Sequence, residues 1–269
     1  MTVIEAMRAR RSVRTFTGKP LTNEDSAELS GFIKGLKAPF GANARIALIH
    51  AEDDGKPVKL GTYGIIKGAS DYMALIHRDG PLAEQGAGYI FEQAVLKCTQ
   101  MGLGTCWLGG TVNRGDFIKQ AGLEGGEHLL LVSPVGYPAE KRRLVERMMR
   151  SGAGSDGRKS FGELFFDGDF SRPLTEGNAG MYIEPLEMVR RAPSASNSQP
   201  WRIIIHDGNV HFYDKKAGRF SGFDLGIAMC HFESACRELG IKGRFESTGR
   251  KSEDGNTYIL SWVKGQATY

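Results

Sequence analysis

Apolar residues recur at helical spacing between positions 82 and 101, which is the strongest secondary-structure signal in the chain. Side chains three and four residues apart share one face of a helix, so this pattern predicts a helix with one apolar side. The members of the stripe are Ala87, Ile90, Phe91, Ala94, Val95 and Cys98. Gly102 and Gly104 follow closely and are expected to end the helix.

Periodicity and turn residues divide the rest of the chain into further helices and short strands. Helices are predicted at residues 3–11, 23–36, 113–121, 182–191 and 224–239. Strands are predicted at residues 45–50, 72–76, 129–135, 201–206, 210–214, 243–247 and 257–263. Thr22 and Asp25 have the spacing of a capping box, and Asp207-Gly208 is a typical hairpin turn. Because helices and strands mix without regular βαβ units, the chain is predicted to be α+β.

Residues 136–180 differ from their surroundings, because they are rich in Gly, Arg, Lys and Ser and have little periodicity. We interpret them as a long arm or linker and not as packed elements. The predicted organisation is a first half at residues 1–150, a connecting arm at 151–180 and a second, shorter half at 181–269.

Two segments of the first half recur in the second half in the same order. Residues 38–43 align with 192–197, and residues 86–103 align with 224–241, at offsets of 192 − 38 = 154 and 224 − 86 = 138. The matched residues are Gly88 with Gly226, Cys98 with Cys236, and Gly102-Leu103 with Gly240-Ile241. An internal duplication explains both matches. Since helix–loop–strand segments are common, chance similarity is the alternative.

Composition and charge indicate an ordinary soluble protein. Of the 269 residues, 41% are hydrophobic and 25% are charged, and the net charge is only +4. No face of Lys and Arg with interleaved aromatic residues is evident, which argues against nucleic-acid binding. The four cysteines include no Cys-x-x-Cys pair, so neither a disulfide framework nor a metal site is expected. No run of about 18 apolar residues occurs, and we expect a cytoplasmic protein without a membrane span.

The first predicted helix ends in Arg10-Arg11-Ser12-Val13-Arg14. Guanidinium groups bind phosphate through two hydrogen bonds at a time, and a serine hydroxyl adds a donor. The cluster therefore fits a phosphate or a phosphorylated cofactor. Composition alone favours the alternative of a solvated basic helix end that interacts with the helix dipole.

A small, polar loop at residues 191–201 contains Pro193 and Pro200 and leads directly into the apolar segment 201–205. Loops held by a buried strand commonly present side chains and backbone groups to ligands. Trp201 itself is expected to pack in the core and not to contact the ligand.

Four segments together resemble the nitroreductase (flavin reductase) family. They are Arg10 to Phe16, Gly102 to Gly110, Val135 to Glu140 followed by Arg158-Lys159, and Pro193 to Trp201. Each segment alone is weak, whereas four in one chain are specific. The resemblance is to a subgroup of single-chain members with tandem half-domains. It implies a central antiparallel sheet flanked by helices and bound FMN.

The resemblance also assigns roles to residues, position by position. Arg10, Ser12 and Arg158 would hold the FMN phosphate, with Arg11 in the same cluster and Lys159 or Arg143 assisting. Arg14 would approach the pyrimidine edge of the flavin ring, where its charge stabilises the reduced cofactor.

Two loops would contact the ring itself. The backbone of Leu108, Gly109 and Gly110 would lie near N5 and O4, since glycine allows close approach. Pro193, Ser194, Ser196 and Asn197 would lie against the ring, with Gln199 supporting their loop.

The order of the segments departs from the family pattern. In typical members the polar loop follows the arginine segment closely and reaches the flavin of a partner subunit. Here Ala38 to Asn43 stand at that position without the Gln-Pro-Trp tail, and Ser194 of the complete copy follows Ser12 by 194 − 12 = 182 residues. The simplest explanation is a fused pseudo-dimer in which one chain holds one complete FMN site. This predicts a monomer, or a weak homodimer.

The function implied is an NAD(P)H-dependent oxidoreductase. NAD(P)H would deliver hydride to flavin N5, and a nitroaromatic, quinone or similar electrophilic acceptor would then replace it in a ping-pong sequence. The flavin would carry the chemistry, so no protein acid or base is expected to be catalytic. Two alternatives stay open: an FMN-binding module without substantial turnover, and a specialised enzyme of the same fold that fragments flavin or removes halogen reductively.

Three further features are interpreted as structural. Gly152 to Ser160 approximates a phosphate-binding loop, but Arg158 stands where Lys is required and no apolar strand precedes it. His231 is expected to be a packing histidine with a satisfied ring. Cys106 is expected to be a buried thiol, because no oriented histidine accompanies it.

Overall fold

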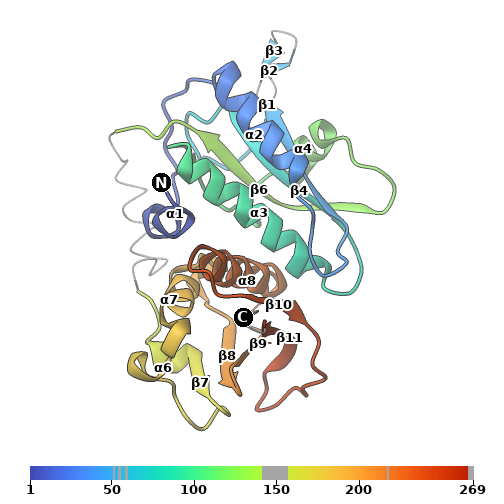
Figure 1. The fold of residues 1–269 in the computed structure, drawn as a ribbon. Helices are drawn as coiled ribbons and strands as arrows, with labels where there is room; N and C mark the ends of the chain where they lie inside the picture. The colour runs from blue at the N-terminus through green and yellow to red at the C-terminus, as the bar shows by residue number, and fades with distance from the viewer. Residues whose placement is uncertain (51, 54–55, 58–59, 141–156, 217, 266–269) are drawn as a thin grey trace. The chain divides into compact units, whose positions relative to one another are not determined.

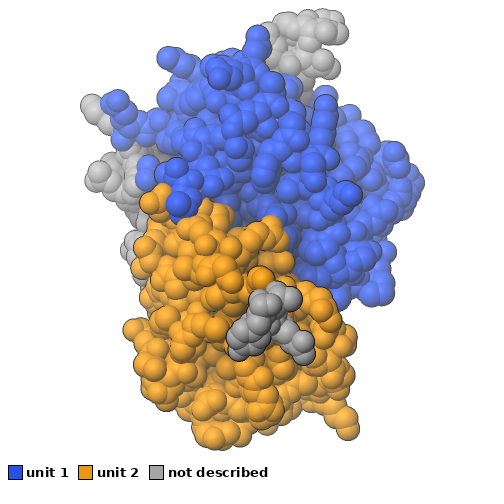
Figure 2. Space-filling model, in the orientation of Figure 1, with its two compact units in different colours: residues 1–2, 9–150 blue, residues 3–8, 151–269 orange. Residues whose placement is uncertain are grey.

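A computed structural model describes residues 1–50, 52–53, 56–57, 60–140, 157–216 and 218–265. The chain forms two compact units, which Figure 2 colours separately. Unit 1 comprises residues 1–2 and 9–150, and unit 2 comprises residues 3–8 and 151–269. Most of the first helix, α1 (Val3–Ala9), therefore belongs to the unit formed by the C-terminal part of the chain. Its Ile4 N–H donates to Glu238 Oε2 at 3.0 Å.

Unit 1 is built on a four-stranded sheet whose strands are all antiparallel, in the order β1-β4-β6-β5 (Figure 1). These strands are β1 (Ala44–His50), β4 (Asp71–Arg78), β5 (Gly104–Thr105) and β6 (Glu127–Gly136). The helices are α2 (Asn23–Gly35), α3 (Ala83–Gln100) and α4 (Arg114–Ala121). A small hairpin of β2 (Glu52–Asp53) and β3 (Lys56–Pro57) completes the unit.

The core of unit 1 surrounds strand β4, which is buried along nearly its whole length. Tyr72, Ala74 and Ile76 share one face of the strand and belong to a cluster that includes Phe117 of α4. The rings of Tyr72 and Phe117 meet edge to face with their centroids 5.3 Å apart. Helix α3 also contacts β1 and β4. This burial explains why the sequence of β4 is apolar without strict alternation.

Unit 2 is built on a five-stranded sheet in the order β10-β11-β9-β8-β7. The strands are β7 (Phe165–Asp167), β8 (Trp201–His206), β9 (Asn209–Asp214), β10 (Gly243–Glu246) and β11 (Thr257–Lys264). Its helices are α6 (Phe161–Leu164), α7 (Ile183–Arg191) and α8 (Ser221–Glu238), with short 3-10 turns at Glu176–Asn178, Gly180–Tyr182 and Ala195–Asn197. The predicted β8–β9 hairpin is confirmed, and Asp207 and Gly208 turn the chain with φ of 50° and 76°.

The α+β prediction is confirmed, but the interpretation of residues 136–180 as lacking packed elements is wrong for residues 161–167. This stretch forms α6 and β7, and β7 pairs with β8 in parallel. Phe161, Leu164 and Phe165 are buried, so their apolar side chains hold the segment against the rest of unit 2. An apolar run this short gave no periodicity that could be read from the sequence.

The two units repeat one topology, as the recurring sequence segments predicted. In each, a helix leads through a loop to two antiparallel strands, then to a long helix, a short edge strand and a last strand. Unit 1 adds the β2–β3 hairpin between its first two strands and α4 before its last strand. The strand order β1-β4-β6-β5 of unit 1 corresponds to β8-β9-β11-β10 of unit 2. Both long helices, α3 and α8, have 18 residues. The repeat concerns each unit by itself, and the arrangement of the halves as a pseudo-dimer stays a prediction.

The ends of the two long helices match in detail. Leu103 N–H donates to Cys98 O at 2.8 Å, and Ile241 N–H donates to Cys236 O at 2.8 Å. Gly102 and Gly240 make this possible, because they adopt φ of 76° and 71°. This is the left-handed helix end for which glycine is favoured. The residue pairs predicted from sequence at an offset of 138 thus occupy equivalent structural positions.

Candidate functional site

Three of the family-like segments converge in unit 1. Ser12 and Thr105 form a parallel bridge, in which Val13 N–H donates to Thr105 O at 2.8 Å. Phe16 forms an antiparallel bridge with Pro138. A Cβ on Gly104 would lie only 2.9 Å from the side chain of Val13, so the arginine segment approaches the glycine-rich loop as closely as glycine allows.

Glu92 of α3 joins the arginine segment and the glycine-rich loop from within the core. Its carboxylate is fully buried and accepts a hydrogen bond from Trp107 Nε1 at 2.8 Å. Its other oxygen lies 4.0 Å from Arg10 Nε. Sequence analysis missed this residue, although an acid among the apolar residues of helix 82–101 was a readable signal.

Several guanidinium nitrogens of unit 1 are buried without a hydrogen-bond partner among the described residues. They are Arg14 Nη1 and Arg114 Nε, together with Arg10 Nε, whose ion-pair partner Glu92 lies 4.0 Å away and beyond hydrogen-bond distance. Buried donors are nearly always paired, so unpaired donors on arginines point to a missing acceptor. These donors suit an anionic or carbonyl-bearing ligand, and the residues present therefore fit the phosphate and ring edge of FMN. Arg114, which also donates from Nη2 to Gly109 O at 3.3 Å, was not predicted.

The glycine-rich loop offers fewer backbone donors than expected. Leu108 N–H donates to Val132 O at 2.9 Å, and Val132 N–H donates to Leu108 O at 2.9 Å. The N–H of Leu108 is thus already paired. Gly109 and Gly110 are therefore the residues whose N–H groups we still expect to lie near the flavin N5 and O4. Gly110 is exposed, and a Cβ added there would meet no atom within 4 Å.

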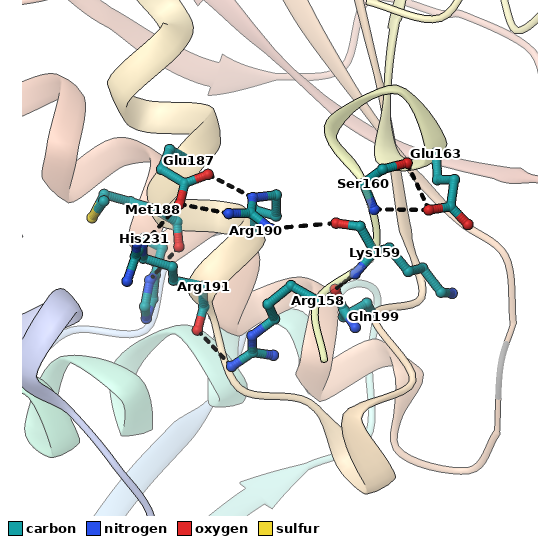
Figure 3. Close-up of polar contacts among 10 residues, drawn as sticks. All are labelled: Arg158, Lys159, Ser160, Glu163, Glu187, Met188, Arg190, Arg191, Gln199 and His231. Atoms are coloured by element: carbon teal, nitrogen blue, oxygen red, sulfur yellow. Dashed lines mark hydrogen bonds and ion pairs between the residues drawn. The ribbon is translucent and has the colours of Figure 1, made fainter. Parts of the chain in front are cut away.

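The polar loop 191–201 of unit 2 is fastened by Arg158 (Figure 3). Arg158 Nη1 donates to Asn197 Oδ1 at 2.6 Å and to Ala192 O at 3.1 Å, and Nη2 donates to Arg191 O at 3.0 Å. Arg158 was expected to hold phosphate. Its terminal nitrogens bind the loop, and the phosphate contact stays a prediction.

Lys159 contacts the same loop. Its N–H donates to Gln199 Oε1 at 3.0 Å, and its Nζ donates to Ser198 O at 2.9 Å. Burial, and then the charges of Arg202 and Lys215, lower the pKa of Lys159. Arg143, the alternative to Lys159, lies outside the described residues.

The backbone of the loop is strained. Ser196, Asn197 and Gln199 have positive φ of 52°, 54° and 48°. Each left-handed non-glycine residue costs about 1–2 kcal/mol, less for Asn. Gln199 offsets this cost through hydrogen bonds from its N–H to Ser194 Oγ at 2.9 Å and from Nε2 to Asn197 O at 3.2 Å. Strain held by so many side-chain contacts is typical of functional loops.

Asp224, near the start of α8, holds the same loop from the core side. Ala195 N–H donates to its two carboxylate oxygens, at 3.0 Å and 3.2 Å. Asp224 is buried, and this burial raises its pKa to about 7. Hydrogen bonds from Ala195 and Ser198 act in the opposite direction, and the charge of Asp214 adds to the increase. Sequence analysis did not single out Asp224.

The structure therefore sorts the predicted residues into two sets. Unit 1 contains Arg10, Arg11, Ser12, Arg14, Leu108, Gly109 and Gly110. Unit 2 contains Arg158, Lys159, Pro193, Ser194, Ser196, Asn197 and Gln199. Within each unit the segments contact one another. Arg11 is exposed, which makes it the least enclosed of the arginine cluster.

Trp201, His231 and Cys106, which were interpreted as structural, are buried, whereas the segment Gly152 to Ser160 lies partly outside the described residues. Trp201 is fully buried, and His231 is buried with its Nδ1 2.9 Å from Met188 O (Figure 3). Cys106 is buried, and the four cysteines, all in the described part of the chain, form no disulfide. The described residues contain no cluster of His, Cys, Asp and Glu side chains suited to a metal ion. Among them, no helix combines the length and apolar character needed to cross a membrane.

The repeated α+β topology, the arginine and glycine-rich segments that meet in unit 1, and the polar loop of unit 2 are together typical of a nitroreductase-like protein. A family model described as "Putative TM nitroreductase" matches residues 2–236. The chain belongs to this family. A search of the curated proteins finds no match.

Several solved structures are similar to this chain to different extents. A "putative nitroreductase" from Thermotoga maritima MSB8 is 18% identical, with a TM-score of 0.63, and the match covers 98% of this chain and 94% of that one. A nitroreductase with bound FMN from Bacteroides fragilis NCTC 9343 is 19% identical, with a TM-score of 0.41, and the match covers 54% of this chain and 92% of that one. An FMN-dependent nitroreductase from Clostridium difficile R20291 is 14% identical, with a TM-score of 0.41, and covers 52% and 90% of the two chains.

Proposed function

We propose that this protein is an FMN-dependent oxidoreductase that uses NAD(P)H to reduce nitroaromatic, quinone or similar electrophilic acceptors. The observation that carries the proposal is the set of buried guanidinium nitrogens on Arg10, Arg14 and Arg114 that have no hydrogen-bond partner in the described part of the chain. Arg10 and Arg14 lie in the segment that resembles a flavin-binding signature, and Arg114 donates to Gly109 O of the glycine-rich loop. Membership of the family supports the same conclusion.

The arginine segment would bind the cofactor's anionic groups. Arg10 and Ser12 would donate to the phosphate, where a charge-assisted hydrogen bond contributes about 1.5–3 kcal/mol. Arg14 would place its charge near the ring edge and favour the reduced cofactor. Bound FMN would supply the redox chemistry, accepting hydride from NAD(P)H and passing electrons to the acceptor.

Two loops would orient the ring. The N–H groups of Gly109 and Gly110 are the proposed donors of unit 1, and Arg114 would fix that loop through Gly109 O. We propose that Pro193, Ser194, Ser196 and Asn197 of unit 2 contact the same flavin, so that one chain binds one FMN. This part of the proposal rests on the family-like sequence of the loop and on its strained, well-fastened backbone.

The test is to purify the chain, measure its visible flavin absorbance and determine the amount of FMN released per chain. NADH and NADPH oxidation would then be followed with nitrofurazone and with menadione as acceptors. We expect one FMN per chain and acceptor-dependent oxidation of NAD(P)H. Tight FMN binding without turnover would instead indicate a flavin-binding module, and a protein that cannot be loaded with excess FMN would contradict the proposal.

A further inference from the structure

Each of the two long helices carries one buried carboxylate, at different positions of the repeat. In α3 it is Glu92, and in α8 it is Asp224. The position equivalent to Glu92 in α8 is Cys230, since 230 − 92 = 138, and the position equivalent to Asp224 in α3 is Gly86, since 224 − 86 = 138. Burying a carboxylate costs several kcal/mol unless it is paired, so each acid needs a specific reason to stand where it does.

In unit 1, Glu92 contacts the arginine segment and the residue that precedes the glycine-rich loop at Leu108, both of which belong to the proposed FMN site. It accepts from Trp107 Nε1, one residue before the loop at Leu108, and it pairs with Arg10 across 4.0 Å. A carboxylate behind the guanidinium orients it and keeps its charge compensated in the core. The arginine that would bind phosphate is therefore held in place from its buried side.

Unit 2 lacks this arrangement and also lacks an Arg-Arg-Ser-x-Arg segment. The counterparts of Glu92 and Trp107 at an offset of 138 are Cys230 and Phe245, neither of which can form the pair. Phe245 packs instead against Phe212 and Trp262, with ring centroids 5.4 Å and 5.2 Å apart. The carboxylate is thus present in the unit that keeps the arginine segment.

Asp224, in contrast, is present in the unit that keeps the polar loop and absent from the unit that keeps the arginine segment. Its carboxylate accepts from Ala195 N–H in the polar loop that unit 2 keeps. At the equivalent position of unit 1, Gly86 packs directly against the loop at residues 38–43, where a Cβ would lie 2.3 Å from Ala42 Cβ and 2.8 Å from Pro39 O. That loop lacks the Gln-Pro-Trp tail, and its junction with the helix leaves no room for an acid.

We propose that Glu92 and Asp224 are positioning residues for the cofactor, each acting on the signature segment that its unit retains. Glu92, itself held by the hydrogen bond from Trp107 Nε1, orients Arg10 and thereby governs phosphate binding. Asp224 holds the left-handed loop at residues 194–199, and thereby governs contact with the flavin ring. This inference rests on the proposed FMN binding.

The test compares FMN with riboflavin, which lacks the phosphate, in Glu92→Gln and Asp224→Asn. We expect Glu92→Gln to weaken FMN about tenfold, the equivalent of about 1.4 kcal/mol, and to leave riboflavin nearly unchanged. In an Arg10→Ala background, Glu92→Gln should cause no further loss, because the two residues act through one contact. Asp224→Asn should weaken FMN and riboflavin by similar factors.

Glu28→Gln and Asp169→Asn are matched controls, since these acids are exposed and remain outside both segments. If Glu92→Gln fails to fold, Trp107→Phe takes its place, because it removes the indole donor to Glu92. If Asp224→Asn fails to fold, Ser198→Ala takes its place, because it removes the hydroxyl donor to Asp224. We expect Trp107→Phe to affect FMN more than riboflavin, and Ser198→Ala to affect both alike.

Equal loss of FMN and riboflavin in Glu92→Gln, or additivity with Arg10→Ala, would overturn the role of Glu92. Unchanged affinities in Asp224→Asn would overturn the role of Asp224. If the unmodified protein binds neither FMN nor riboflavin, the proposed function fails and this inference fails with it. If it binds FMN and the variants match their controls, only the inference fails.

Discussion

Gly86 and Asp224 occupy the same position of the two long helices, 224 − 86 = 138 residues apart, and they join helix to loop in opposite ways. Gly86 lets the loop at residues 38–43 pack directly on the helix backbone. Asp224 reaches out and accepts a hydrogen bond from Ala195 N–H of the corresponding loop. The two units therefore differ at the junction between the long helix and the loop that precedes the first strand.

Gly86→Ala should destabilise the protein, because the added Cβ would lie 2.3 Å from Ala42 Cβ and the packed loop must shift. Overpacking of this kind typically costs about 1–3 kcal/mol. Gly31→Ala is the matched control: Gly31 is an exposed interior residue of α2 with no atom within 4 Å of the new Cβ. It should stabilise by about 0.5–1 kcal/mol through helix propensity. Urea unfolding measures both, and equal shifts in the two variants would contradict the expected difference.

Asp224 should make stability depend on pH. Its folded pKa of about 7 lies above the usual value of about 3.9 in an unfolded chain. Between these values the folded state binds more protons, so the contribution of Asp224 favours folding at pH 4 and declines as pH rises to about 7. As the pH rises from 4 to about 7, the unfolding free energy of the unmodified protein should therefore fall relative to that of Asp224→Asn. A difference independent of pH would show that the Asp224 pKa is not raised.

Arg158→Ala should loosen the polar loop, because three loop acceptors lose their donor. We expect faster amide hydrogen exchange at residues 191–199 and a loss of about 1.5–3 kcal/mol in stability. Arg158→Lys should restore little, since a single ammonium group does not reproduce the planar fork. Arg172→Ala, at an exposed arginine of unit 2, is the control. Unchanged exchange in Arg158→Ala would contradict the fastening role.

Arg10→Ala and Ser194→Trp should each reduce the FMN bound per chain, although the residues belong to different units. The first removes a phosphate donor, and the second adds a large side chain to the loop proposed to lie against the ring. Lys34→Ala, at an exposed position of α2, serves as the charge control. Equilibrium titration with FMN checks the affinities. Unaltered FMN affinity in Ser194→Trp would contradict the contribution of the second unit.

Much of the fold was readable from local patterns. Helices α2, α3, α4, α7 and α8 and the β8–β9 hairpin lie within a few residues of their predicted positions. The Thr22 cap is also present, with Asp25 N–H donating to Thr22 Oγ1 at 3.1 Å. Helix α6 and strand β7 were missed, since a short apolar segment becomes an edge strand only when β8 lies beside it.

The sequence by itself determined the α+β class, the repeated topology and the identity of the signature segments, because periodicity and motif spacing are local properties of the chain. Only the tertiary structure decided which groups meet. It placed most of α1 with unit 2, joined Arg158 to the polar loop by hydrogen bonds and paired Leu108 with Val132. It also buried Glu92 and Asp224 beside their partners. Such pairings depend on which side chains packing excludes from water, and that is settled by residues distant in sequence.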